Sequence, residues 1–145
     1  MTLDEFWKWM ALVDVQALED GDDEGAVEPL IDALSEESEE QIFAFEERLA
    51  EVLHALDGRV FAGDADGSSD GFLYRRCYVV ALGRESYEAA LANPALMPTD
   101  TESWCEPLLF VSPTAWSNVT GQDMDLWEYA TRVSYETGSN RTGWT

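Results

Sequence analysis

The pattern of apolar residues between positions 38 and 58 constrains the fold more than any other feature of the sequence. These residues recur every three or four positions, the spacing that places side chains on one face of an α-helix. They are Ile42, Phe45, Leu49, Val52, Leu53 and Leu56. Ser38 and Gln41 have the spacing of a capping box at the start, and Gly58 is predicted to cap the end in the left-handed conformation. A helix with one apolar face needs neighbouring elements to cover that face.

Two amphipathic segments precede this helix. Residues 2–5 have capping-box spacing, and apolar residues at helical spacing then run from 6 to 17, before a break at Gly21. A second apolar stripe over 27–34 predicts another helix, with Pro29 in its first turn, where a missing N–H costs little.

Residues 72–82 are compatible with either a strand or a helix. Their β-branched and aromatic side chains favour a strand, but the segment also has a helical face, with Ser69 or Asp70 as its cap. The chain offers no second good strand for pairing, and an isolated strand is not stable. We therefore predict a helix here, after a loop over 63–71.

The remaining sequence predicts shorter elements. A helix over 86–92 ends before Asn93, because the residue before a proline avoids the helical region. The irregular stretch that follows contains Pro98, Pro107 and Pro113, with one or two short helices near Trp104 and Leu109. The last helix is predicted over 126–133, where apolar residues again have helical spacing, with Gly138 as its cap.

Together these elements predict an all-α fold. It is a single compact domain of about six to seven helices over residues 1–138, with an irregular proline-containing stretch before the last helix. Residues 139–145 form a polar C-terminal tail in this prediction. Hydrophobic residues make up 46% of the 145 residues, which is too apolar for a disordered acidic chain.

The charge of the chain is strongly negative and unevenly distributed. The formal net charge is −22, and 18 of the 30 acidic residues lie before position 58, where only Lys8 and Arg48 are basic. Such a field repels nucleic acid and anionic lipid and attracts cationic surfaces. We therefore expect a basic protein partner, and no binding to nucleic acid or to a membrane.

The first functional hypothesis is a non-catalytic interaction domain whose acidic surface faces a basic partner. An immunity-type inhibitor of a basic toxin or nuclease is its concrete version, because an acidic face fits a site built for phosphates. The predicted partner-binding residues are Glu36, Glu37, Glu39, Glu40, Glu46 and Glu47. An adaptation of the whole proteome to acidity would explain the charge without a binding site, and this alternative stays open.

Another alternative is a small-molecule-binding domain or an uncharacterised enzyme. Its pocket would be lined by Arg76, Tyr74, Tyr78 and Trp104. Arg76 lies on the apolar face of its predicted helix, and a buried arginine requires a carboxylate partner. Asp70 or a glutamate of the first half is the predicted partner, in a structural ion pair or a ligand site.

One segment partly matches a calcium-binding loop. Asp64, Asp66 and Ser68 have the spacing of its first three ligands. The rest of the pattern fails, because Ser69 stands at the position of the required glycine and Arg75 at that of the bidentate glutamate. A solvated turn that caps the next helix is the favoured interpretation.

No other motif predicts catalysis, a metal or a cofactor. His54 is the only histidine and has no second ligand at metal-binding spacing. Cys77 and Cys105 lie in apolar segments, where a free cysteine behaves as a small hydrophobic residue. Adjacent glutamates on a helix are more often a solvated surface than an acid–base pair. We therefore predict a chain that is not an enzyme and that binds no metal or cofactor.

The chain has no sign of export or membrane insertion. No basic region followed by an apolar run stands at the N-terminus. No apolar stretch reaches the ~20 residues that span a bilayer. We therefore expect a cytoplasmic protein.

A further pattern extends over most of the chain. It consists of Ser69-Asp70-Gly71-Phe72, Tyr74, Arg76, Tyr78, Gly83, Tyr87, Ala90-Leu91 and Pro94, with Asp4-Glu5-Phe6-Trp7 near the start and Glu128, Tyr135 and Thr137-Gly138 near the end. This pattern resembles the bacterial domain of unknown function 4240 family. Ser69, Arg75 and Tyr78 depart from it, standing where the family has an acid, a phenylalanine and a tryptophan. The resemblance implies a compact, largely helical cytoplasmic domain, and it lends no catalytic residue.

Overall fold

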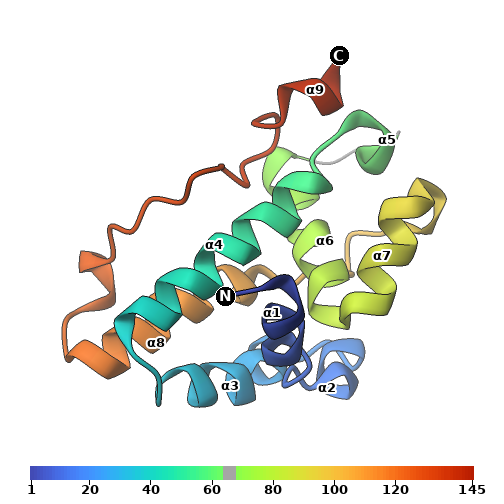
Figure 1. Ribbon diagram of the computed structural model, residues 1–145. Helices are drawn as coiled ribbons and strands as arrows, with labels where there is room; N and C mark the ends of the chain where they lie inside the picture. Colours follow the sequence, from blue (N-terminus) through green and yellow to red (C-terminus); the bar gives the residue numbers. More distant parts are fainter. Residues whose placement is uncertain (64–67) are drawn as a thin grey trace.

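The computed structural model describes residues 1–63 and 68–145, and these residues form helices and irregular segments without a strand. The α-helices are α1 Leu3–Met10, α2 Val15–Glu19, α3 Asp23–Leu34, α4 Glu39–Ala55, α5 Arg59–Ala62, α6 Ser69–Leu82, α7 Arg84–Ala92, α8 Val111–Thr120 and α9 Arg141–Trp144. Three short 3₁₀ helices are η1 Pro94–Leu96, η2 Glu106–Phe110 and η3 Met124–Leu126. Figure 1 shows them gathered around α4, which confirms the predicted compact all-α fold.

The longest helix, α4, is the centre of the fold. Ser38 begins it as predicted, because its hydroxyl accepts a hydrogen bond from the N–H of Gln41 at 3.3 Å. The apolar face is fully buried at Ile42, Phe45, Leu49 and Leu53. α8 packs against one side of α4, and α1 and α6 contact other parts of it. Burying each such side chain contributes about 1.5–3 kcal/mol, so this stripe is a large share of the core.

The segment predicted as one helix over 6–17 forms two helices. Thr2 and Glu5 make the predicted capping box at the start of α1. The helix ends at Met10, and Asp14 starts α2 by accepting a hydrogen bond from the N–H of Ala17 at 3.1 Å. The prediction of one continuous helix is therefore wrong, because an aspartate in its middle caps a new helix.

The third helix begins earlier than predicted, which changes the position of Pro29. Asp22 caps α3 by accepting a hydrogen bond from the N–H of Gly25 at 3.0 Å. Pro29 consequently lies in the helix interior rather than in the first turn, where the sequence analysis placed it. An interior proline has no N–H for the carbonyl one turn earlier, here that of Gly25.

The segment that was compatible with a strand or a helix is the helix α6. The helical prediction for 72–82 is confirmed, and the helix extends further towards the N-terminus. Its cap is Ser68, which accepts a hydrogen bond from the N–H of Gly71 at 3.0 Å. The predicted caps, Ser69 and Asp70, instead lie in the first turn.

Prolines end one helix and begin another in the second half. α7 ends as predicted at Ala92, and its C-cap Asn93 has an extended backbone (φ −137°, ψ 94°) before Pro94. Pro113 was placed in an irregular stretch, but it is the third residue of α8. Proline, which lacks an N–H, is tolerated at that position because the N–H groups of the first turn of a helix have no intrahelical acceptor.

Gly58 does not cap α4 in the left-handed conformation, so this prediction is wrong. Its backbone is extended (φ −167°, ψ 159°), and it is the N-cap of α5. A Cβ atom at this position would lie 3.2 Å from the carbonyl oxygen of Gly143. The glycine therefore permits the close approach of α9 to the end of α4.

The helix predicted over 126–133 is absent, and this prediction is also wrong. Residues 127–138, called the strap below, have no regular secondary structure and run beside α4 (Figure 1). Along the strap, odd-numbered residues are half-buried and even-numbered residues are exposed. An alternation of two residues is the pattern of an extended segment lying on a surface, not of a helix. Tyr129, for example, stacks on Phe43 of α4 with ring centroids 4.5 Å apart.

Replacing Pro29 by alanine is expected to stabilise the protein by about 1–2 kcal/mol, because alanine restores a helical N–H and removes the ring. Urea unfolding followed by tryptophan fluorescence measures the change. Asp32→Ala, on the same exposed face of α3, is the control and should change the free energy of unfolding by less than about 0.5 kcal/mol. A Pro29→Ala protein less stable than the parent would contradict this account of α3.

Candidate functional site

The six glutamates predicted to bind a partner do not share one surface. Glu36, Glu39 and Glu40 are exposed, and Glu39 also accepts a hydrogen bond from the indole Nε1 of Trp116 at 2.9 Å. Glu37 is half-buried. Consecutive helical residues point about 100° apart, so adjacent acids on α4 face different neighbours.

Glu46 is buried, so its assignment to a partner-binding surface is wrong. Only 4% of the residue is exposed, and one carboxylate oxygen, Oε2, has no hydrogen-bond partner. Burial raises the pKa of Glu46 to about 7, and the negative charge of Glu47 adds to this rise, while the neighbouring hydroxyl of Ser112 on α8 opposes it. Helical periodicity places Glu46 beside Phe45 and Leu49, on the margin of the apolar stripe, and α8 covers it there.

Glu47 and His54 hold the strap against α4. Glu47 accepts hydrogen bonds from the hydroxyl of Tyr129 at 2.8 Å and from the backbone N–H of Arg132 at 3.2 Å. The Nδ1 atom of His54 lies 2.9 Å from the carbonyl oxygen of Ser134, and it donates the proton of that bond. Both side chains therefore have structural roles, and Glu47 is not free for a partner.

Arg76 is buried as predicted, but its partner is not Asp70. The side chains of Arg76 and Asp57 are both fully buried, with the Nη2 and Oδ1 atoms 4.0 Å apart. The guanidinium also donates to the carbonyl oxygens of Leu53 at 2.8 Å and Tyr135 at 2.9 Å. Asp70 is exposed at the start of α6. Burial lowers the pKa of Arg76, and the charge of Asp57 partly restores it.

Asp57 binds the last residue of the strap and the segment that follows it. It accepts hydrogen bonds from the N–H of Gly138 at 3.1 Å, the N–H of Asn140 at 2.9 Å and the indole of Trp144 at 2.9 Å. Residues 139–145, which the sequence analysis set apart as a polar tail, thus contact the buried ion pair. We call Asp57, Arg76 and the segment that they hold, residues 135–144, the clasp. Most polar groups of Asp57 and Arg76 bond to backbone or to residues 135–144, although Arg76 Nε has no hydrogen-bond partner. This arrangement indicates a structural role.

The residues of the predicted ligand pocket do not line a common cavity in the described part of the chain. Tyr74 and Trp104 touch edge to face, with ring centroids 5.4 Å apart. Arg76 extends from the same helix into the clasp instead. Tyr78 lines other hollows, one beside α7 and one beside α2.

The two cysteines are free and buried, as predicted. Burial raises the pKa of the Cys105 thiol to about 12, and it also raises the pKa of Cys77. A buried neutral thiol is a poor nucleophile. Among the described residues, no group of three or more His, Cys, Asp and Glu side chains is arranged to hold a metal ion. Asp64 and Asp66 of the partial calcium pattern lie outside those residues.

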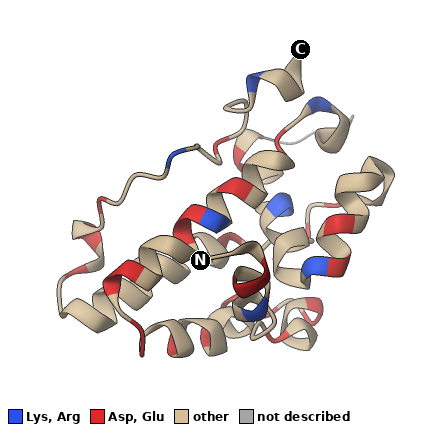
Figure 2. Ribbon diagram, in the orientation of Figure 1, with Lys and Arg blue, Asp and Glu red and all other residues tan. Residues whose placement is uncertain are grey.

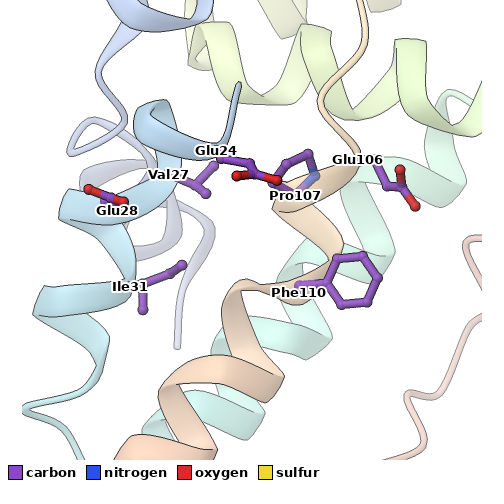
Figure 3. A pocket seen from close by; sticks show the side chains of 7 residues that line it. All are labelled: Glu24, Val27, Glu28, Ile31, Glu106, Pro107 and Phe110. Carbon is purple, nitrogen blue, oxygen red and sulfur yellow. The ribbon is translucent and has the colours of Figure 1, made fainter. Parts of the chain in front are cut away.

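A groove between α3 and η2 combines an apolar centre with acidic edges. It has a volume of about 380 Å³ and is lined by Glu24, Val27, Glu28, Ile31, Glu106, Pro107 and Phe110. In Figure 3, Glu24, Val27 and Ile31 extend from α3 towards η2, whereas Glu28 lies at the outer edge of α3. Glu106 and Phe110 extend from the far side of η2. The sequence analysis missed this groove, because its two walls are about 80 residues apart in the chain.

The charged side chains that line the groove are all negative. Three of its lining residues are glutamates, and no lining residue is basic. Figure 2 shows acidic residues on α1 to α4, α6 and α7, and basic residues only at scattered positions. Phe110 is 46% exposed and adds apolar surface at the edge of the groove. An apolar surface framed by uncompensated carboxylates is complementary to a cationic, partly apolar partner.

The chain belongs to the family described as protein of unknown function (DUF4240), whose model matches residues 1–134. This finding confirms the resemblance seen in the sequence. Comparison with curated proteins and with solved structures found no match. None of the helices in the described ranges is long and apolar enough to cross a membrane.

Replacing Asp57 by alanine is expected to destabilise the protein by about 3–5 kcal/mol, because it leaves Arg76 buried without its counter-ion. Hydrogen exchange should also become faster at the amides of residues 135–144. Asp70→Ala, which removes the partner predicted from sequence, should lower the free energy of unfolding by less than about 1 kcal/mol. Equal destabilisation by the two substitutions would contradict the assignment of Asp57 as the partner.

Replacing Glu46 by glutamine is expected to flatten the dependence of stability on pH. The folded-state pKa of about 7 exceeds the ordinary value of 4.5, so the folded state binds this proton more tightly than the unfolded state. The resulting stabilisation is complete below pH 4.5 and is lost as the pH rises to about 7. The free energy of unfolding of Glu46→Gln, measured in urea and taken relative to that of the parent, should therefore rise by about 3 kcal/mol between about pH 5 and pH 8. Glu40→Gln, which changes an exposed residue of the same helix, should leave the dependence of stability on pH unchanged. If Glu46→Gln also leaves that dependence unchanged, the account of a buried carboxyl at Glu46 is contradicted.

Proposed function

We propose that this chain is a non-catalytic, cytoplasmic interaction domain that binds a basic protein partner at the groove between α3 and η2. The observation that carries the proposal is the combination of exposed Phe110, an apolar groove centre and three glutamates with no basic residue among them. Exposed apolar surface framed by charge is typical of protein interaction sites.

The electrostatics of the whole chain supports the same proposal. With a net charge of −22, the protein attracts a cationic partner over distances longer than a contact. Such steering raises the association rate more than it raises the affinity, and it weakens as salt screens the charges. An inhibitor of a basic toxin or nuclease is the concrete version that we favour, because carboxylates can occupy a site built for phosphates.

Not all of the glutamates predicted from sequence are available to a partner. Glu46 is buried, and Glu39 and Glu47 are hydrogen-bonded to Trp116 and to the strap. Glu36, Glu39 and Glu40 are exposed, but they line none of the hollows found in the described part of the chain. The groove therefore offers more contact than the acidic face of α4, and the two surfaces can be compared directly.

The test uses two variants that each remove three negative charges. The groove variant carries Glu24→Gln, Glu28→Gln and Glu106→Gln, and the control variant carries Glu36→Gln, Glu40→Gln and Glu85→Gln. Affinity capture from cells of the source organism, at about 20 mM and about 200 mM salt, is followed by purification of the captured protein and by calorimetry.

We expect one basic protein that binds the parent and the control variant in a saturable one-to-one complex. The groove variant should lose at least about tenfold in affinity, which corresponds to roughly 1.4 kcal/mol. Polylysine serves as the non-specific comparison. If only polycations bind, and both variants bind them as the parent does, the proposal is overturned.

A further inference from the structure

The wall of the groove formed by α3 contains two apolar and two acidic side chains. Val27 and Ile31 are four residues apart, and so are Glu24 and Glu28. Residues at this spacing lie one above the other on a helix, about 6 Å apart along its axis. In Figure 3, however, only Glu28 lies at the outer edge of α3, whereas Glu24 extends with Val27 and Ile31 towards η2. Val27 is buried, with 2% of the residue exposed, so half-buried Ile31 supplies most of the apolar surface of this wall.

The wall formed by η2 completes the arrangement on the other side. Pro107 lies on the side of η2 that faces α3, and Glu106 and Phe110 lie beyond it (Figure 3). Across the groove, Glu28 is therefore at one edge and Glu106 at the other, and Glu24 extends between Val27 and Pro107. The apolar centre is bordered by negative charge on both of its long sides.

We infer that the partner contributes an amphipathic helix whose apolar stripe is flanked on both sides by lysine or arginine. This inference rests on the proposed function and specifies the partner's binding segment. A helix places cations on both margins of its apolar stripe, so the apolar centre and the glutamates on both sides of it are contacted at once. In an extended segment, the residues next to an apolar residue point to the opposite face, away from the glutamates.

The test uses the full chain and two synthetic peptides of identical composition. One peptide has leucines at helical spacing flanked by lysines, and the other alternates leucine and lysine. We expect the helical peptide to bind at least about tenfold more tightly than the alternating peptide, as measured by fluorescence anisotropy of a dye on the peptide. Phe110→Ala should remove most of this difference, whereas Leu126→Ala, which replaces a 56% exposed leucine outside the groove, should preserve it.

The outcomes separate this inference from the proposed function. If both peptides bind equally and the groove variant binds neither, the helical inference fails and the groove remains the cationic binding site. If the groove variant binds the helical peptide as tightly as the parent does, the inference fails and so does the proposed site. Failure of both peptides to bind the parent at about 20 mM salt would also overturn both. Circular dichroism of each variant checks that its fold is intact.

Discussion

The buried ion pair between Asp57 and Arg76 is the interaction on which the rest of the structure most depends. Both side chains are fully buried, and a buried charge is tolerated only with a counter-ion and hydrogen bonds. Asp57 follows the end of α4, Arg76 lies in the middle of α6, and their remaining bonds reach residues 135–144. Two side chains therefore fix the relative positions of a central helix, a second helix and the C-terminal segment.

Two faces of the central helix α4 contact two different parts of the protein. Its apolar stripe is buried in the core, whereas Glu47 and His54 bond to the strap. Several acids of the first half therefore have partners within the protein. This division shifts the expected binding surface away from α4 and towards α3 and η2, where the glutamates line an open groove instead.

Local periodicity predicted the elements that depend on local contacts. The stripe of α4 and the burial of Arg76 follow from spacing, whereas the helix over 72–82 also needed the argument that no second strand is available to pair with it. The strap was assigned as a helix because Leu126, Tyr129 and Val133 have helical spacing. However, the odd positions from 127 to 137 are Trp, Tyr, Thr, Val, Tyr and Thr, and the residues between them are mostly polar. This alternation was a readable signal for an extended segment.

Other features depend on tertiary contacts that no local pattern encodes. Asp70 is six residues from Arg76 and was the obvious partner, but Asp57, 19 residues away, is the one that is buried beside it. Glu46 looks like a surface residue in the sequence, and only the position of α8 buries it. The groove likewise exists only because residues 24–31 pack near residues 106–110.

The central claim is that the groove is the surface where a cationic partner binds. Mapping of backbone amide shifts by NMR, with the helical leucine–lysine peptide added to the full chain, tests it most directly. The account predicts that the largest shifts fall on residues 24–31 and 106–110, with small changes on the strap and on α7. Shifts centred on the exposed face of α4, or spread evenly over all acidic residues, would contradict it.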